Sequence, residues 1–131
     1  MTIQDRIVHT RWEGGMRAVT DARGFDIISD EPEKSGGANI GPQPTDLLLA
    51  SIVSCFTLAM AYVAKKRAVE LTGLSVEAVG TYDRPRFASI WVSVTSSSPR
   101  EVLEQLMPQA ERLCYVTNTL RQQPEVTIRL G

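Results

Sequence analysis

Hydrophobic and polar residues alternate through most of the first third of the chain, a pattern typical of strands. Three such segments, residues 7–12, 16–20 and 25–29, are separated by glycine-containing turns at residues 13–15 and 21–24. Because the connections are short, we expect neighbouring strands to run antiparallel, as a meander.

A long loop and a helix follow. Residues 30–44 are rich in glycine and proline, and ordered loops of this length are often functional. Thr45 can cap the start of the helix, and Asp46 favours the positive end of its dipole. Basic residues at 65–67 favour the other end, and Gly73 is the stop signal.

Apolar residues cover nearly every face of this helix between residues 47 and 63. A helix that is apolar all round must be buried all round. One small sheet can cover only one stripe of it, so the remaining faces need a second helix, a partner chain, or both. We therefore expect a homodimer.

Alternation resumes in residues 74–82 and 87–95, which the turn at 83–86 joins into a hairpin. The sequence of residues 98–101 is that of a capping box, and it places Pro99 at the first position of a second helix. We expect the hairpin to be followed by this helix.

Pro108 is expected to kink or divide this second helix. Residues 117–122 suit a short last helix, and residues 125–130 alternate as a final strand. The expected order is β-β-β-α-β-β-α-β, which is an α+β fold formed by one domain over residues 1–131.

Charge and composition exclude several function classes. Fourteen basic and fifteen acidic residues give a net charge of −1, so there is no basic field to hold nucleic acid or an anionic membrane. The apolar stretch at residues 47–64 is interrupted by polar residues, unlike a membrane span. The N-terminus has no apolar core of signal-peptide length, so we expect a cytoplasmic protein.

The chain has two cysteines and one histidine, too few for a structural zinc site or a disulfide scaffold. Cys55 and Cys114 both lie on predicted helices, where cysteines often only fill core space. Packing of both helices on one sheet would make contact between the thiols possible. A permanent disulfide is disfavoured in the reducing cytoplasm.

A reactive Cys55 would need a group that stabilises its thiolate. It lies ten residues after Thr45, about 15 Å along the axis, whereas the dipole effect fades within one turn. Arg17 and Arg23 are the candidate cations. His9, the single histidine, is more readily interpreted as a strand or surface residue.

Residues 41–51, leading to Cys55, resemble the first cysteine helix of the OsmC/Ohr family, the osmotically inducible and organic hydroperoxide resistance proteins. Residues 113–120, around Cys114, resemble the second cysteine segment of that family. Residues 72–78 resemble the strand after its first helix, and the order of elements agrees along nearly the whole chain.

The resemblance implies an intertwined homodimer with the cysteine helices at its centre and active sites at the subunit interface. In the peroxidase members, the first cysteine attacks the peroxide and becomes a sulfenic acid, and the second forms a disulfide with it. This implies that Cys55 is the peroxidatic thiol and Cys114 the resolving thiol. No bound cofactor or metal is implied, and an external dithiol, such as a lipoylated protein, is the implied reductant.

The chain differs from the peroxidase pattern at two places. Thr45 stands where the peroxidases have a glutamate, and the neighbouring Asp46 points about 100° away on a helix. The arginine that directly follows a glycine pair in the peroxidases is displaced here, so Arg17 and Arg23 both remain candidates. These differences favour the broad OsmC-like branch over a close Ohr protein.

The main hypothesis is therefore a thiol-dependent peroxidase acting on organic hydroperoxides. Apolar residues near Cys55, namely Leu48, Ile52, Phe56 and Met60, suit a fatty or aryl hydroperoxide better than hydrogen peroxide. One alternative is a protein that binds a small apolar molecule and has inert cysteines. Another is a different thiol chemistry, such as thiol transfer or thioester cleavage.

Overall fold

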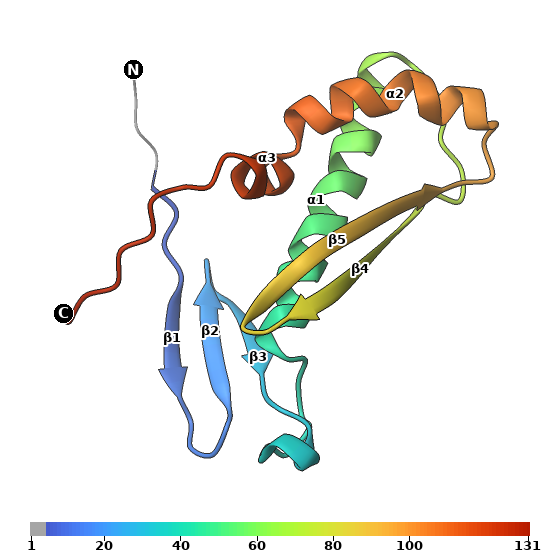
Figure 1. The fold of residues 1–131 in the computed structure, drawn as a ribbon. Coiled ribbons are helices and arrows are strands. Elements are labelled where there is room, and N and C mark those ends of the chain that lie inside the picture. The colour runs from blue at the N-terminus through green and yellow to red at the C-terminus, as the bar shows by residue number, and fades with distance from the viewer. Residues whose placement is uncertain (1–4) are drawn as a thin grey trace. The chain divides into compact units, whose positions relative to one another are not determined.

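The computed structural model describes residues 5–131, which form three α-helices and two small antiparallel sheets (Figure 1). The predicted α+β fold is confirmed. The chain divides into two compact units, Met1–Leu48 and Leu49–Gly131, which are described separately. Residues 1–4 lie outside the described range, and the single domain predicted over residues 1–131 stays a prediction.

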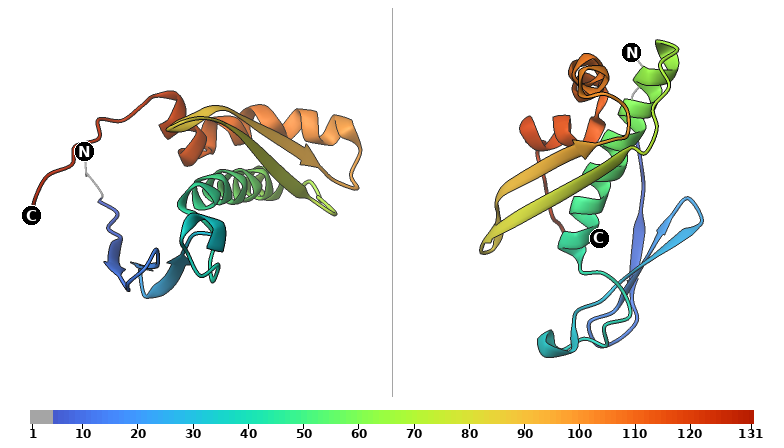
Figure 2. Two further views of the ribbon diagram at one scale, coloured as in Figure 1. Left: turned by 60° about the horizontal axis from the view of Figure 1, so that its bottom comes forward. Right: turned by 90° about the vertical axis from the view of Figure 1, so that its right-hand side faces the viewer.

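The first unit contains the predicted three-stranded meander. Strands β1 (His9–Trp12), β2 (Ala18–Ala22) and β3 (Phe25–Ser29) pair antiparallel in the order β1-β2-β3 (Figure 2). Arg23 and Gly24 both have positive φ, 55° and 91°, at the turn between β2 and β3. Two consecutive positive φ angles are typical of the tight hairpin turn that suits the twist of paired strands.

The loop after β3 is organised around a buried carboxylate. Asp30 is 2% exposed, and its Oδ1 accepts the N–H of Glu31 at 2.7 Å. Its Oδ2 accepts the N–H groups of Ala38 and Ile40, each at 3.3 Å. The loop also holds the short 3₁₀ helix η1 (Glu33–Ser35). Asp30 therefore satisfies backbone donors at both ends of the segment from Glu31 to Ile40.

Helix α1 (Pro44–Lys66) begins one residue before the expected cap and ends before Gly73. One face is buried in the core, whereas Leu58 is 69% and Tyr62 is 53% exposed. Its best 18-residue window has a mean hydropathy of 2.2, so its length and composition would also suit a membrane span. Core helices of soluble proteins pass the same test.

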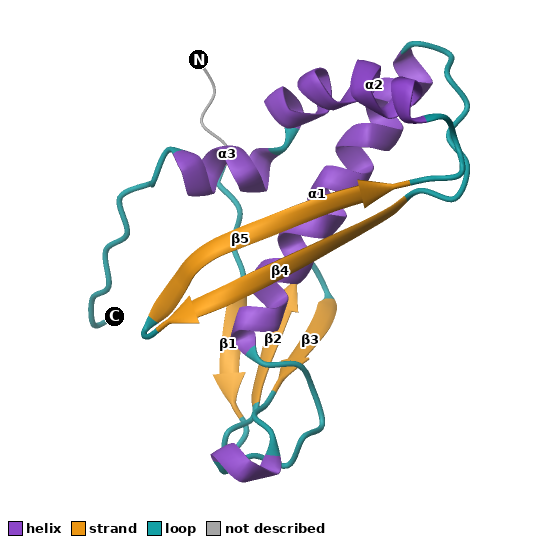
Figure 3. Ribbon diagram, turned by 45° about the vertical axis from the view of Figure 1, so that its right-hand side comes forward, coloured by secondary structure: helices purple, strands orange, loops and turns teal. Residues whose placement is uncertain are grey.

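The predicted hairpin is confirmed. Strands β4 (Ser75–Asp83) and β5 (Arg86–Thr95) pair antiparallel, and their register shifts between Thr81 and Tyr82 (Figure 3). Val79 lies opposite Trp91, and both are more than half exposed. The hairpin thus presents an apolar cross-strand pair to solvent in the single chain.

Helix α2 (Arg100–Leu113) corrects two expectations. Pro99 is its N-cap rather than its first residue, and Ser98 Oγ accepts the N–H of Thr72 at 3.2 Å instead of capping the helix. The expected capping box is therefore absent. Pro108 does not divide α2 either, because loss of one backbone donor leaves the other helical hydrogen bonds to hold the turn.

The break comes six residues later, at Cys114, and is followed by helix α3 (Tyr115–Arg121). The expectation of a short last helix is confirmed, but the expected strand at residues 125–130 is wrong for the single chain. Val126, Ile128 and Leu130 are 78%, 93% and 99% exposed. A strand needs a partner for its backbone groups, and these residues have no paired strand beside them.

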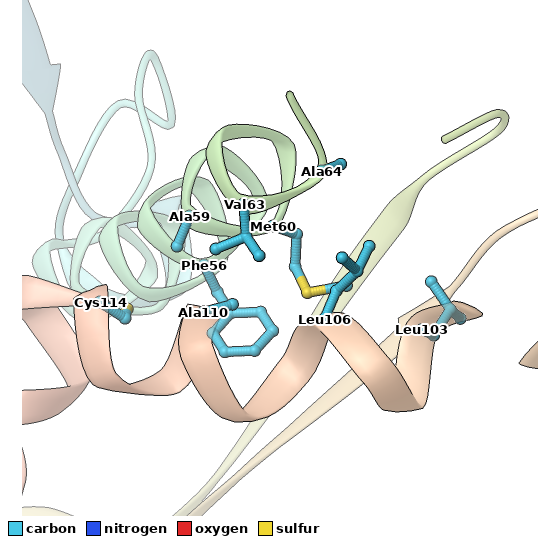
Figure 4. Packing of buried hydrophobic residues seen from close by; sticks show 9 residues of the cluster. All are labelled: Phe56, Ala59, Met60, Val63, Ala64, Leu103, Leu106, Ala110 and Cys114. Carbon is cyan, nitrogen blue, oxygen red and sulfur yellow. The ribbon is translucent and has the colours of Figure 1, made fainter. Parts of the chain in front are cut away.

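The core of the second unit lies between α1 and α2 (Figure 4). Its buried members are Phe56, Ala59, Met60, Val63, Ala64, Leu103, Leu106, Ala110 and Cys114. Arg67, the residue after α1, connects the two helices: its guanidinium donates to Gln105 O at 2.9 Å and to Gln109 Oε1 at 2.8 Å. Cys114 is thus part of the same cluster that holds α1 against α2.

Candidate functional site

The two cysteines meet in the second unit. Cys55 lies on α1, is half-buried and packs against the core cluster to which the fully buried Cys114 belongs. Both are free thiols. The structure therefore brings together the pair that the sequence analysis selected.

Cys114 occupies the break between α2 and α3. Its backbone is extended, with φ of −77° and ψ of 101°, and it is both the C-cap of α2 and the N-cap of α3. The Cys114 carbonyl oxygen accepts the Thr117 hydroxyl at 3.3 Å and the N–H of Asn118 at 3.1 Å. Asn118 Nδ2 also donates to Arg112 O at 3.0 Å and so joins the two helices across the break.

Burial raises the pKa of the Cys114 thiol, because a buried anion loses hydration. Hydrogen bonds from the Thr117 side chain and backbone, from Cys55 and from Val116 lower it, and together they outweigh burial. The net result is a Cys114 pKa below its usual value. Hydrogen bonding to the charged form is the physical cause.

The lowered pKa of Cys114 was not predicted from the sequence, where a cation near Cys55 was expected instead. The signal in the sequence is a threonine three residues after a cysteine, Cys114 and Thr117, at the start of a short helix. Serine and threonine are common at helix N-caps. Cys114 occupies the N-cap position of α3, and a cysteine there is easily interpreted as a residue that only fills core space.

A pocket of about 280 Å³ lies between α1, β5 and α3. Its lining combines apolar and polar side chains and comprises Ile52, Phe87, Ala88, Ser89, Ile90, Val92, Thr117, Leu120 and Arg121. Ile52 is one helical turn before Cys55, and Thr117 hydrogen-bonds to Cys114. The pocket is therefore lined by residues close in sequence to both cysteines, although neither cysteine lines it.

A second hollow of about 180 Å³ shares several of these lining residues and adds Phe56 and Glu111. Arg121 lines both spaces and lies 3.7 Å from the Glu111 carboxylate. Two of the apolar residues expected near Cys55, Ile52 and Phe56, thus line open space. A third, Met60, is fully buried in the core.

The other candidate residues belong to the first unit. The N–H of Glu31 has the largest effect in lowering the pKa of the Asp30 carboxyl, and Arg17, which lines a pocket with Asp30, lowers that pKa by the smallest amount. The Arg23 guanidinium lies over the Phe25 ring, 5.7 Å from its centroid. These contacts explain both arginines within their own unit, and any role of either toward Cys55 stays a prediction.

Asp46 and His9 have simpler placements. Asp46 Oδ2 accepts the N–H of Gln43 at 2.9 Å, so the carboxylate helps to start α1. His9 is an exposed residue at the start of β1. Among residues 5–131, no group of three or more His, Cys, Asp and Glu side chains is placed to hold a metal ion.

Comparison with known proteins adds a family to this geometry. The sequence matches the model of the OsmC-like protein family over residues 36–129, which include both cysteines. No curated protein matches the sequence significantly.

Several solved structures have the same fold. An OsmC-like protein from Mycoplasma pneumoniae has a TM-score of 0.78 at 14% identity, with 93% of this chain and 91% of that chain covered. A putative osmotic stress induced and detoxification response protein from Psychrobacter arcticus has a TM-score of 0.72 at 21% identity, with 91% of each chain covered.

A putative organic hydroperoxide resistance protein from Vibrio cholerae, with captopril in one of its active sites, has a TM-score of 0.70 at 22% identity. The match covers 94% of this chain and 88% of that one. At these identities, the structural matches establish the fold. With the family match across both cysteine segments, they show that this chain belongs to the OsmC-like family.

Proposed function

We propose that this protein is a thiol-dependent peroxidase that reduces organic hydroperoxides, with Cys55 as the peroxidatic thiol and Cys114 as the resolving thiol. The observation that carries the proposal is that Cys55 packs against the buried cluster that contains Cys114, with both cysteines present as free thiols. The resemblance to a hydroperoxide resistance protein supports the same reaction class.

The reaction proceeds in two balanced steps. The Cys55 thiolate attacks one oxygen of the hydroperoxide, the O–O bond breaks, and Cys55 becomes a sulfenic acid while an alkoxide leaves and takes a proton from solvent to become the alcohol. Cys114 then attacks the Cys55 sulfur, and a disulfide and water form. Half-burial of Cys55 allows peroxide to reach its sulfur, whereas full burial of Cys114 protects the resolving thiol from solution.

The apolar pocket favours a small apolar hydroperoxide as substrate. Ile52, Phe87 and Leu120 would pack against an alkyl or aryl group, which hydrogen peroxide lacks. We expect the catalytic efficiency to be higher with cumene hydroperoxide than with hydrogen peroxide for this reason.

Turnover requires an electron donor that returns the disulfide to two thiols. We propose an external dithiol protein, such as a lipoylated protein, as this reductant, with no bound cofactor. Catalytic disulfides that form and are reduced again are typical of reducing compartments, which supports cytoplasmic localisation.

We also propose an intertwined homodimer. The single chain leaves Leu58 and Tyr62 of α1 exposed, together with the alternating apolar residues of the segment at 125–130. A second copy would bury the helix face and supply a strand edge to pair with that segment. In the dimer, the thiol pair would then lie at or near the subunit interface.

Counting thiols after exposure to a slight excess of cumene hydroperoxide tests the reaction. We expect the wild type to lose both thiols and Cys55→Ser to consume no peroxide. Cys114→Ser should form a sulfenic acid that a dimedone-type reagent traps, because it retains the peroxidatic thiol but not the resolving one. Retention of both thiols by the wild type would contradict the proposal.

That last outcome would favour the second candidate function, binding of a small apolar molecule in the pocket with inert cysteines. The specific observation in its favour is the pocket of about 280 Å³ itself. Binding of cumyl alcohol, which lacks the reactive O–O bond, should then be unaffected by Cys55→Ser and weakened by Ile52→Glu.

A further inference from the structure

We propose that Phe87 is the specificity-determining residue of the pocket between α1, β5 and α3, and that its ring receives the aryl group of an aryl alkyl hydroperoxide. Gly80 and Tyr82, on the neighbouring strand β4, act as positioning residues for this ring. The inference rests on the proposed peroxidase function and narrows its substrate class. The pocket and all three residues belong to the second unit.

The first support is the close contact between Phe87 and Gly80. A Cβ added at Gly80 would lie 2.6 Å from Cε1, 2.8 Å from Cδ1 and 2.9 Å from Cζ of the Phe87 ring, too close for a real side chain. Gly80 is not among the described glycines with a positive φ, so its backbone would accept other residues. Glycine inside a strand often marks a place where another group approaches closely. The missing side chain at Gly80 is therefore what allows the ring to lie there.

The second support is the stack of two aromatic rings. Tyr82 pairs with Phe87 across the hairpin, and their ring centroids lie 4.8 Å apart with the planes 4° from parallel. Phe87 lines the pocket, whereas neither Tyr82 nor Gly80 does. The two β4 residues thus hold the ring from outside the pocket, and the rest of its surface borders open space.

The third support is the irregular register of the hairpin at this point. Thr81 pairs with Ser89 and Tyr82 pairs with Phe87, so Ala88 has no partner in β4. Side chains of a regular strand alternate between two faces, yet four consecutive residues near the start of β5 line the pocket. Bulges re-aim side chains and are common next to active sites. The register shift therefore lets this end of β5 face the pocket.

The size and position of the pocket suit an aryl group. An apolar cavity of about 150 Å³ can hold benzene, so about 280 Å³ has room for one ring with a short branched substituent. Two aromatic rings attract each other beyond the burial of their area, which favours an aryl over an alkyl group against Phe87. Ile52, one helical turn before Cys55, lines the same pocket, so the ligand would lie against the part of α1 that carries the peroxidatic thiol.

The ratio of kcat/KM for cumene hydroperoxide to kcat/KM for tert-butyl hydroperoxide tests the role of Phe87. Phe87→Leu keeps an apolar side chain but removes the ring, so we expect this ratio to fall about fivefold, with kcat/KM for tert-butyl hydroperoxide near the wild-type value. Phe25→Leu, at an exposed phenylalanine of the first unit, is the matched control and should keep the ratio. An unchanged ratio in Phe87→Leu would overturn the inference.

Gly80→Ala tests the positioning of the ring. The new methyl group forces the Phe87 ring to move, and the pocket is the open space that the ring borders. We expect KM for cumene hydroperoxide to rise about tenfold with little change in kcat, because binding is obstructed while both thiols are retained.

The double variant shows whether Gly80 acts through Phe87. In a Phe87→Leu background, Gly80→Ala should have little further effect on KM, because leucine has no ring to displace. A purely structural role of Gly80 would change KM by the same factor in both backgrounds, and that result would contradict its assignment as a positioning residue.

Binding of the product cumyl alcohol to the reduced protein, measured by isothermal titration calorimetry, separates failure of the inference from failure of the proposed function. If the wild type binds cumyl alcohol more tightly than tert-butanol and Phe87→Leu does not, the role of Phe87 holds even when no hydroperoxide is consumed, and only the peroxidase proposal is wrong. If the wild type consumes hydroperoxide and Phe87→Leu keeps the wild-type preference in both assays, the peroxidase proposal stands and the inference is wrong. Circular dichroism checks that each variant is folded.

Discussion

Two buried acidic groups, one in each unit, are stabilised by the same kind of donor and differ in what surrounds them. Asp30 in Met1–Leu48 accepts three backbone N–H groups from its own loop. Cys114 in Leu49–Gly131 is approached by the backbone N–H groups of Val116 and Thr117. In both cases hydrogen bonds to the anion lower the pKa of the group.

The difference lies in the neighbours. The donors to Asp30 come from the loop that it closes, and no second nucleophile is among its hydrogen-bond partners in the described residues. Cys114 instead lies in an apolar cluster against which a second thiol, Cys55, packs. A buried acidic group thus organises a loop in one unit, and in the other unit it lies near a second thiol, which supports the proposed redox chemistry.

The largest effect on stability is expected from the core that holds Cys114. Leu106 is 1% exposed between α1 and α2, and Leu106→Ala should lower the free energy of unfolding by about 2–5 kcal/mol through lost burial and a cavity. Urea unfolding measures this loss. Leu120→Ala, at a residue 41% exposed, is the control and should cost clearly less. Equal losses would mean that the α1–α2 core is not the dominant support of the second unit.

A smaller effect is expected at the exposed face of α1. If Leu58 is buried between two copies, Leu58→Glu removes an apolar contact worth about 1.5–3 kcal/mol and should weaken dimerisation at least tenfold. Sedimentation velocity over a range of concentrations measures this. Lys66→Glu, at the polar end of the same helix, should leave association unchanged. A wild type that sediments as a monomer throughout would rule out the dimer.

The smallest effect is expected at Asp30. Since the folded pKa is lowered, this carboxylate stabilises the first unit above the ordinary aspartate pKa of about 3.9. That contribution is lost as the pH falls through the lowered folded value. Asp30→Asn should therefore reduce Tm by several degrees at pH 7 and make little further difference in strong acid.

Thermal unfolding at pH 7 and at pH 2 checks the prediction for Asp30, with the exposed Asp26→Asn as control. The loss of both thiols on exposure to cumene hydroperoxide should be unchanged in Asp30→Asn at temperatures well below Tm. Loss of that reaction in a folded Asp30→Asn protein would break the distinction between the two buried acids.

Local patterns predicted most of the elements. Alternation at β2, β3, β4 and β5 and the long apolar stretch of α1 were read correctly, because strand and helix periodicities are properties of neighbouring residues. The capping box at residues 98–101 failed because Ser98 bonds to Thr72, a residue far away in sequence. A side chain that can cap a helix can also satisfy another backbone donor, and tertiary contacts decide between them.

The same limit applies to the last strand. Residues 125–130 have the correct alternation, but a strand exists only when a neighbouring strand accepts its backbone groups. The pattern therefore identifies a segment that can pair, and the single chain leaves it unpaired. The conformation of Arg23 was likewise not predicted from the sequence, because its positive φ belongs to the hairpin turn that the pairing of β2 and β3 requires.

The sequence by itself determined the α+β order of the main elements and singled out Cys55 and Cys114 as the candidate reactive residues. Only the tertiary structure decided that Cys55 packs against the cluster in which Cys114 is buried. The physical reason is that identity and periodicity are encoded locally. The ionisation of a thiol depends on burial and on hydrogen bonds, some of which come from groups distant in sequence.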